Sequence, residues 1–292
     1  MKMATLKIGE VEKAAIRAPH GYVLLESLGG KWPTELLELL RSGLLGELHA
    51  WYREGGAEVL LRLPAVDTAG LRYGPLYREP SKIWGIGMNY VAEESELLQI
   101  PAGEEPVGFM KPATALIGPG EKIRVPEGFG EVTAEAELAI VIGKACRGIT
   151  EAEAPSVVAG FTTALDMTAS DIHARNPRFL TRAKSFDTFL SIGPELVTPD
   201  EVGDVLDLEV ETVWGGEVKH ANRIRNMRFR PWYTVAFHAA FMTLLPGDII
   251  LTGTPGAVVI RDGDVVECRV GGMQPLVNPV AAIPAVPQVE AG

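Results

Sequence analysis

Apolar residues come in short runs along most of the chain, and Gly or Pro residues separate these runs. Runs of this length that are rich in β-branched residues are typical of strands. The predicted strands cover residues 21–28, 83–87, 107–111, 122–125, 135–142, 161–165, 206–214, 249–252 and 265–270. Helical spacing is rarer, and we expect helices at residues 34–48, 92–98, 150–160 and 232–245. Many strands with few helices predict an α+β fold that is mainly β, rather than a doubly wound sheet.

A turn-rich stretch, Gly-Pro-Leu-Tyr-Arg-Glu-Pro-Ser at residues 74–81, divides the chain. Residues 1–75 contain leucines at helical spacing and no cluster of titratable side chains, so we expect a small N-terminal domain that acts as scaffold. Most of the predicted strands follow the stretch. We therefore expect a second, larger domain at residues 80–285, and we expect any functional site to lie there.

Two carboxylates, Glu135 and Glu137, stand at the start of an apolar run from Leu138 to Ile142. On a strand, residues two apart point to the same face, so both side chains converge on one small region where like charges repel. Such a pair persists if a cation neutralises it, if one carboxylate is protonated, or if water solvates both at an exposed strand end. The pattern alone leaves these three possibilities open.

Composition and charge exclude several classes of protein. The net charge of −11 argues against a sequence-independent nucleic-acid binder, because no basic stripe is present to neutralise phosphates. No run of about twenty apolar residues occurs, so we expect no membrane span. The first residues lack the continuous apolar core of a secretory signal, and we expect a cytoplasmic protein with Cys146 and Cys268 reduced and without a role.

Five separated motifs carry a resemblance to a known family. They are Lys82-Ile83-Trp84-Gly85-Ile86-Gly87-Met88-Asn89-Tyr90, Phe109-Met110-Lys111, Glu135-Ala136-Glu137-Leu138, Lys184-Ser185-Phe186-Asp187-Thr188-Phe189, and Pro246-Gly247-Asp248 with Thr252-Gly253-Thr254-Pro255. In order and spacing the chain resembles the fumarylacetoacetate hydrolase family from residue 82 to about residue 280. The resemblance implies a catalytic domain built as a mixed β-sandwich or roll, next to the small N-terminal domain.

The resemblance also implies a divalent-metal site. In the family, a glutamate pair on one strand and an aspartate on a later strand bind the cation, which corresponds here to Glu135, Glu137 and Asp166. Three carboxylates without histidine suit Mg²⁺, Mn²⁺ or Ca²⁺, and we expect Mg²⁺. Members of the family process small 2-oxo acids, whose ketone and carboxylate oxygens chelate the metal. The metal then polarises the ketone and stabilises an enolate.

Further residues match positions near the metal or the substrate in the family. The resemblance implies that Lys184 is catalytic, because its charge offsets that of an enolate or carboxylate. It also implies that Thr254, in the turn Thr252-Gly253-Thr254-Pro255, hydrogen-bonds substrate. Tyr90 and Lys111 match less specifically, and a packing role is an equal alternative for each.

Two departures from the family pattern put hydrolysis in doubt. Hydrolytic members place a histidine four residues after the Asn of the Asn-Tyr motif and a glutamate seven residues after it, and this pair activates water. Here Glu93 replaces the histidine while Glu96 keeps its place. We keep both as candidate catalytic residues, with an acidic solvated helix as the alternative. After Asp166, the usual arginine and glutamine are replaced by Ser170 and His173. His173 is a candidate substrate-binding residue or proton carrier, with an exposed loop histidine as the favoured alternative.

The sequence therefore predicts a metal-dependent enzyme that acts on a small 2-oxo acid or its enol. C–C bond hydrolysis is the family reaction, while isomerisation, decarboxylation or dehydration fits Glu93 better. The competing hypothesis is a non-catalytic protein that keeps the fold and the metal site. An acidic interaction module has little support, because the carboxylate triad and Lys184 would then be accidental. By resemblance we also expect a homodimer.

Overall fold

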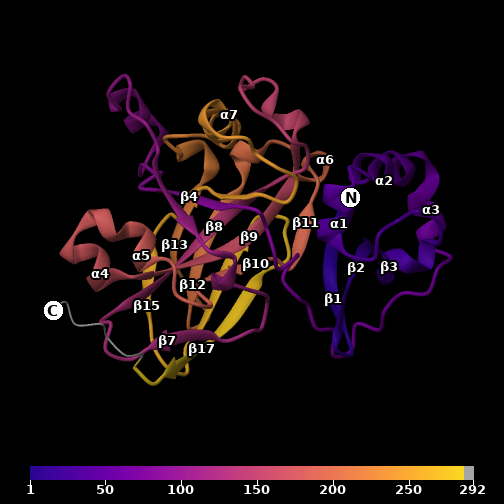
Figure 1. The fold of residues 1–292 in the computed structure, drawn as a ribbon, viewed down its shortest axis with the longest axis horizontal. Helices are drawn as coiled ribbons and strands as arrows, with labels where there is room; N and C mark the ends of the chain where they lie inside the picture. The colour runs from indigo at the N-terminus through magenta and orange to yellow at the C-terminus, as the bar shows by residue number, and fades with distance from the viewer. Residues whose placement is uncertain (286–292) are drawn as a thin grey trace.

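The computed structural model describes residues 1–285 and contains two β-sheets (Figure 1). The strands are β1 (Lys2–Ile8), β2 (Val11–Ala18), β3 (Gly21–Leu24), β4 (Ile83–Gly87), β5 (Val107–Lys111), β6 (Leu116–Ile117), β7 (Ile123–Pro126), β8 (Val132–Ile142), β9 (Val158–Ala169), β10 (Leu190–Ile192), β11 (Glu195–Val197), β12 (Glu209–Trp214), β13 (Glu217–Arg223), β14 (Ile249–Leu251), β15 (Ala257–Ile260), β16 (Val265–Val270) and β17 (Leu276–Ile283). The α-helices are α1 (Leu36–Arg41), α2 (Leu45–Trp51), α3 (Ala57–Leu60), α4 (Ser170–Arg175), α5 (Leu180–Ala183), α6 (Pro199–Val202) and α7 (Pro231–Phe241). The mainly β, α+β fold predicted from the sequence is confirmed.

Strands β8 and β9 form the centre of the larger sheet, whose main order is β3-β2-β1-β11-β9-β8-β14-β4-β5. They pair antiparallel from Val132 opposite Ala169 to Ile142 opposite Val158. The apolar run of β8 is buried on both faces. Leu138 and Ile140 belong to the core shared with the smaller sheet, β13-β12-β16-β17-β7, while Ala139 and Val141 face the core shared with the N-terminal helices. Burial on both faces explains why this run does not alternate with polar residues.

The N-terminal strands belong to the same sheet as the central pair. Strand β1 pairs with β11, and β11 pairs with β9, so β1–β3 extend the larger sheet at one end, shown in indigo in Figure 1. Residues 74–81 contain no helix or strand. The sequence pattern did not predict β1 or β2, and the division into domains at residues 1–75 and 80–285 stays a prediction.

Two predicted helices are wrong in extent or in kind. The helix expected at residues 34–48 is two helices, because α1 ends at Arg41 and Gly43 adopts a positive φ of 74° before α2 begins. The helix expected at residues 150–160 is absent. There the backbone N–H of Thr150 donates to Glu153 Oε2 at 2.8 Å and closes a turn, a 3₁₀ turn covers Ala154–Ser156, and β9 begins at Val158.

Other boundaries also differ from the predictions. The segment expected as an α-helix at residues 92–98 is a 3₁₀ helix, η3 (Glu94–Gln99), and strand 21–28 ends at Leu24 before a 3₁₀ turn. The strand expected at residues 161–165 is longer and contains Asp166, because β9 continues to Ala169. Strand β17 was not predicted at all, since Asn278 and Pro279 interrupt its apolar pattern. Local patterns located nine strands of the described chain, missed β6, β10, β11, β13 and β15 as well, and misplaced several ends.

No helix within residues 1–285 is long and apolar enough to cross a membrane. The expected cytoplasmic location and homodimeric state stay predictions.

Glu121 connects the N-terminal strands, the 74–81 stretch and the loop between β6 and β7. Its carboxylate accepts hydrogen bonds from Lys7 Nζ (2.7 Å), Arg78 (3.1 Å) and the backbone N–H of Gly118 (2.8 Å). Burial disfavours the charged form, but these three donors outweigh burial and lower the pKa of Glu121 from 4.5 to about 2. The ionised carboxylate is therefore more stable in the folded chain than in the unfolded chain.

We expect Glu121→Gln to lower the free energy of unfolding at pH 7 by about 1–3 kcal/mol. Because the folded pKa is depressed, this stabilisation is present above the unfolded pKa and is lost as the pH falls towards 2. The difference between wild type and variant should therefore shrink between pH 4.5 and pH 2. Urea unfolding at pH 7, 5 and 3 measures it, with the exposed Glu127→Gln as control. An equal difference at pH 7 and pH 3 would contradict the ion-pair explanation.

Candidate active site

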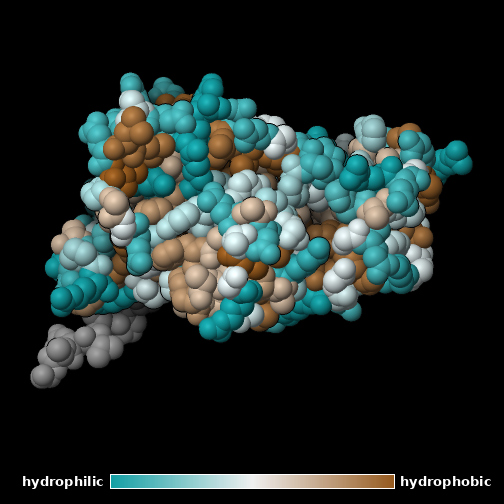
Figure 2. Space-filling view, turned by 90° about the horizontal axis from the view of Figure 1, so that it is seen from above, coloured by the Kyte–Doolittle hydropathy of each residue, from teal (hydrophilic) through white to brown (hydrophobic). Residues whose placement is uncertain are grey.

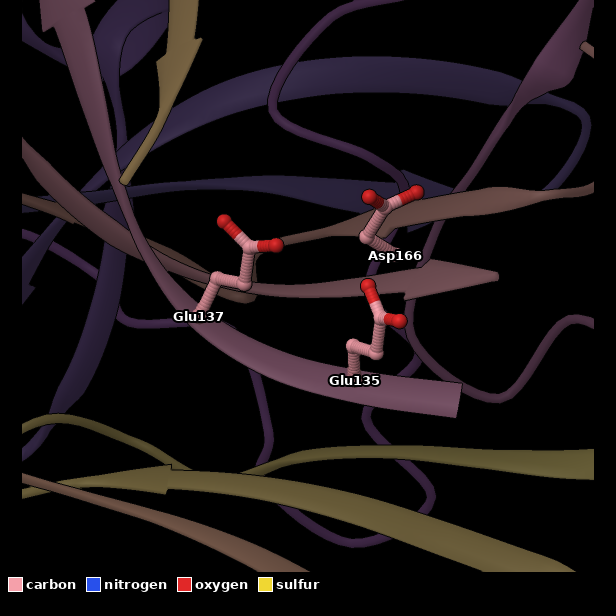
Figure 3. Close-up of side chains that lie close together, drawn as sticks. All are labelled: Glu135, Glu137 and Asp166. Carbon is pink, nitrogen blue, oxygen red and sulfur yellow. The ribbon is translucent and has the colours of Figure 1, made fainter. Parts of the chain in front are cut away.

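Three carboxylates meet at the centre of the larger sheet (Figure 3). Glu135 and Glu137 lie two residues apart on β8, and Asp166 lies on β9 directly opposite Glu135. One oxygen from each carboxylate lies within 4.8 Å of the others. The predicted convergence of the two glutamates is therefore seen in the structure, and it follows from the two-residue period of a strand.

The carboxylates lie inside the protein. Glu137 is 1% exposed, Asp166 is 0% exposed, and the side chain of Glu135 is 17% exposed. The possibility that water solvates both glutamates at an exposed strand end is therefore wrong. A cation or a proton must offset the repulsion among the three groups.

Two buried lysines already supply part of this positive charge. Lys184 Nζ lies 2.5 Å from Asp166 Oδ2 and 2.8 Å from Glu135 Oε2. Lys111 Nζ lies 2.5 Å from Asp166 Oδ1 and 3.2 Å from the carbonyl oxygen of Met167. The two lysines thus bind Asp166 from both sides. Neither lysine has a hydrogen bond or ion pair with Glu137 in the described part of the chain.

The surroundings shift the pKa values of the charged groups in the cluster in different directions. Burial raises the pKa of Glu137 well above its usual value, and the neighbouring Asp166 raises it further. Burial lowers the pKa of Lys111 to about 8. Burial also opposes the charge of Lys184, but the negative charges of Asp166 and Glu135 outweigh it, so the pKa of Lys184 lies above its usual value. Glu137 is thus the carboxylate whose charge has the least compensation.

The donor set fits a hard divalent cation. All three groups offer carboxylate oxygens, and no histidine or cysteine belongs to the cluster within residues 1–285. A cation beside Glu137 would supply the charge that the lysines do not supply there. We therefore consider this cluster to be the candidate metal centre.

Tyr90 contributes a free donor near the cluster. Its hydroxyl group is buried and has no hydrogen-bond partner among residues 1–285. Burial raises the pKa of Tyr90, and the charge of Glu137 raises it further. A buried hydroxyl group without a partner is costly, so it marks a place where a ligand oxygen can bind.

The turn at residues 252–256 borders the cluster. The backbone N–H of Gly253 donates to Glu137 Oε2 at 2.6 Å. Thr254 is half-buried, and its hydroxyl group contacts the backbone of Gly256, with 3.1 Å to the carbonyl oxygen and 3.2 Å to the nitrogen. The turn thus places Thr254 next to a residue that binds a candidate metal ligand, while substrate binding by Thr254 stays a prediction.

Glu93, Glu96 and His173 do not bind the carboxylates of the cluster in the described part of the chain. Glu93 is exposed, Glu96 is half-exposed, and His173 is half-buried on α4. No hydrogen bond or ion pair among residues 1–285 joins any of the three to a carboxylate of the cluster. The catalytic roles of Glu93 and Glu96 and the substrate-binding role of His173 stay predictions.

Residues 91–104, the segment that carries Glu93 and Glu96, are instead held against residues 222–230 by hydrogen bonds and ion pairs. Arg228 pairs with Glu104 at 2.7 Å, and Arg230 pairs with Glu94 at 2.9 Å. The segment projects from the body beside α7 in Figure 1, and Figure 2 shows apolar side chains gathered at this end of the molecule. Exposed apolar residues on or beside it include Met88 and Leu98.

Two further side chains, Thr168 and Phe109, contact the cluster, and neither was predicted to have a role there. Thr168 hydrogen-bonds both Lys184 (2.8 Å) and Glu135 (3.3 Å), and the ring of Phe109 lies 4.6 Å from Lys184 Nζ. Thr168 lies two residues after Asp166 and so shares its face of the strand, which is the signal that could have identified it.

Comparisons with known proteins agree with this site. The family model described as "Fumarylacetoacetate (FAA) hydrolase C-terminal" matches residues 82–281. A mitochondrial oxaloacetate tautomerase of Homo sapiens is 37% identical over 228 residues, which is 75% of this chain and 72% of the relative. An uncharacterized protein of Methanocaldococcus jannaschii is 43% identical over 202 residues, which is 68% of this chain and 83% of the relative.

Solved structures match nearly the whole chain. A 5-carboxymethyl-2-hydroxymuconate delta-isomerase of Mycobacterium smegmatis is 31% identical, with a TM-score of 0.77 over 97% of this chain and 99% of that chain. A maleylpyruvate hydrolase of Sphingobium sp. SYK-6, solved with manganese(II) and pyruvate, is 26% identical, with a TM-score of 0.78 over 97% and 99%. The manganese complex and the carboxylate cluster together support a divalent-metal site in this fold.

Proposed function

The chain belongs to the fumarylacetoacetate hydrolase family of enzymes, and we propose that it interconverts the keto and enol forms of a small 2-oxo acid with a divalent cation. Oxaloacetate is the first candidate substrate, because relatives that are 35–39% identical are named oxaloacetate tautomerases. The observation that carries the proposal is the cluster of three carboxylates and two buried lysines.

In this proposal Glu135, Glu137 and Asp166 hold the cation, which we expect to be Mg²⁺. When bound, the cation supplies Lewis-acid polarisation of the 2-oxo group. The buried position of the carboxylates strengthens this effect, since charge interactions are less screened inside the protein than in water.

The lysines and the tyrosine then act on the substrate. Lys184 and Lys111 present ammonium groups beside Asp166, where they offset negative charge that develops on substrate oxygens. The hydroxyl group of Tyr90 has no protein partner in the described chain and donates to a substrate oxygen. Thr254 adds a hydroxyl group from the neighbouring turn. These four side chains orient the acid while one proton is exchanged between the ketone oxygen and the carbon next to the ketone.

Tautomerisation fits this chain better than C–C hydrolysis. The interconversion only moves a proton between carbon and oxygen, so it needs no activated water. Glu93 stands where hydrolytic members have histidine, and Glu93 and Glu96 make no hydrogen bond or ion pair to the cluster in the described chain. Isomerisation of a larger 2-oxo acid uses the same proton movement, whereas decarboxylation and dehydration require a further bond to break.

The test is the rate of enol-to-keto conversion of oxaloacetate, followed by ultraviolet absorbance, together with deuterium uptake at C3 of oxaloacetate and pyruvate followed by NMR. We expect the protein with Mg²⁺ to exceed Mg²⁺ alone by about 100-fold or more, because the buried lysines and Tyr90 stabilise developing charge in a way that free Mg²⁺ does not. A chelator should remove this acceleration. No acceleration with metal bound, as measured by calorimetry, would favour the non-catalytic alternative. Cleavage of an acylpyruvate would favour hydrolysis instead.

A further inference from the structure

The hairpin of β12 and β13 contacts the turn that borders the candidate metal centre. Strand β13 is the edge strand of the smaller sheet and is mostly exposed. His220 on this strand reaches across to the turn. Its Nε2 lies 3.1 Å from the carbonyl oxygen of Ala257, and its ring packs so closely on Gly256 that a methyl group there would overlap the ring.

The same turn, together with Ala257 directly after it, is connected to both glutamates of the cluster. At its start, the backbone N–H of Gly253 donates to Glu137 Oε2. Directly after the turn, Ala257 pairs with Glu135 in the ladder between β15 and β8. Between these two points lies Thr254, the predicted substrate contact. A shift of the turn would therefore move Thr254 relative to both carboxylates.

Thr212 is a second contact from the same hairpin. It lies opposite His220 in the ladder between β12 and β13 and is completely buried. Its hydroxyl group donates to the carbonyl oxygen of Gly256 at 2.8 Å and accepts from the backbone N–H of Ala136 at 3.3 Å. Ala136 lies between Glu135 and Glu137. The hairpin thus holds the turn and the strand of the two glutamates in one arrangement.

We infer that His220 is a positioning residue for substrate binding: it fixes residues 254–257 so that Thr254 is held at the metal centre. The inference rests on the proposed function, because the effect assigned to His220 is on the position of Thr254, which that function makes a substrate contact. The imidazole donates from Nε2 to the Ala257 carbonyl and has no hydrogen bond or ion pair to the carboxylates within residues 1–285. Gly256 is required because its missing side chain lets the imidazole ring approach the backbone.

The first test compares His220→Ala with His220→Gln in steady-state kinetics of the enol-to-keto conversion. We expect His220→Ala to raise KM about fivefold or more while kcat stays within about twofold, as loss of one positioning hydrogen bond predicts. The glutamine amide can donate to the Ala257 carbonyl, so His220→Gln should restore most of the wild-type KM. Affinity for Mn²⁺, measured by calorimetry, should stay unchanged in both variants.

Val218→Ala is the matched control, because Val218 is exposed on the same strand and lies opposite Val213 rather than opposite Thr212. We expect it to leave KM unchanged. An unchanged KM in His220→Ala would overturn the inference, as would an equal rise in KM in Val218→Ala.

A second test isolates the contact between the ring and the glycine. Gly256→Ala should raise KM in the wild-type background, because the new methyl group displaces the ring or the turn. In the His220→Ala background the same substitution should have little further effect, since the ring is gone. Equal effects in both backgrounds would contradict the contact, because residues in contact show non-additive effects.

Hydrogen exchange separates failure of this inference from failure of the proposed function. We expect His220→Ala to speed amide exchange at Gly253 and Gly256 about fivefold or more, whether or not the protein converts oxaloacetate. An inactive wild-type protein with this change in exchange would contradict the proposed function and keep the positioning role. Unchanged exchange in an active protein would overturn the positioning role alone.

Discussion

Replacing Glu137 by glutamine is expected to abolish metal-dependent turnover and to leave the protein folded. Glu137 is buried, and the lysines of the cluster compensate its charge least. The amide keeps the shape of the side chain, and its oxygen can still accept the hydrogen bond from Gly253. Because burial disfavours the charged form of Glu137, loss of that charge is not expected to lower the stability of the metal-free protein. What is lost is one anionic ligand for the cation.

We expect the affinity for Mg²⁺ and the value of kcat/KM each to fall about 100-fold or more in this variant. Calorimetry measures the affinity, and the rise of the melting temperature with added Mg²⁺ gives a second reading. Glu195→Gln is the control, since Glu195 is also buried but binds Arg17 and Tyr22 outside the cluster. It should alter stability and keep metal binding. Retained metal-dependent turnover in Glu137→Gln would show that the metal assignment is wrong.

Replacing Asp166 by asparagine is expected to damage both stability and activity. Asp166 is completely buried, and its two oxygens each lie 2.5 Å from a lysine ammonium group. Without the carboxylate, Lys111 and Lys184 remain beside each other with less compensation. Removal of one partner from a buried ion pair typically costs about 3–5 kcal/mol, so we expect a loss of this size in the free energy of unfolding.

Urea unfolding of the metal-free protein measures this loss, and the enol-to-keto assay should show at least about 100-fold lower activity. The double variant Asp166→Asn with Lys111→Met distinguishes charge from packing. Because it removes one of the two ammonium groups, it should recover part of the stability and none of the activity. If Asp166→Asn were as stable as the wild type, the ion pairs seen here would contribute little to folding.

Short-range patterns predicted much of the scaffold. The two-residue period placed Glu135 and Glu137 on one face of β8, and β-branched runs located most of the central strands. The same patterns failed where a side chain closes a local turn, as at Thr150 and Glu153, or where the pattern is interrupted, as at Pro279 in β17. They also ended at residue 165 a strand that continues to Ala169. A strand ends where its pairing with neighbouring strands ends. Those neighbours are distant in the sequence, so a local pattern does not include them.

By itself, the sequence determined the family, the mainly β fold and the carboxylates that form the candidate metal centre, because periodicity and motif order are local properties of the chain. Only the tertiary structure showed which atoms of Lys111, Lys184 and Thr168 bind those carboxylates, and that His220 contacts the bordering turn. Lys111 is 55 residues from Asp166 in the chain, and His220 is 37 residues from Ala257. Such contacts form because the packing of two whole sheets brings distant segments together, and the free energy of that packing is not contained in any one segment.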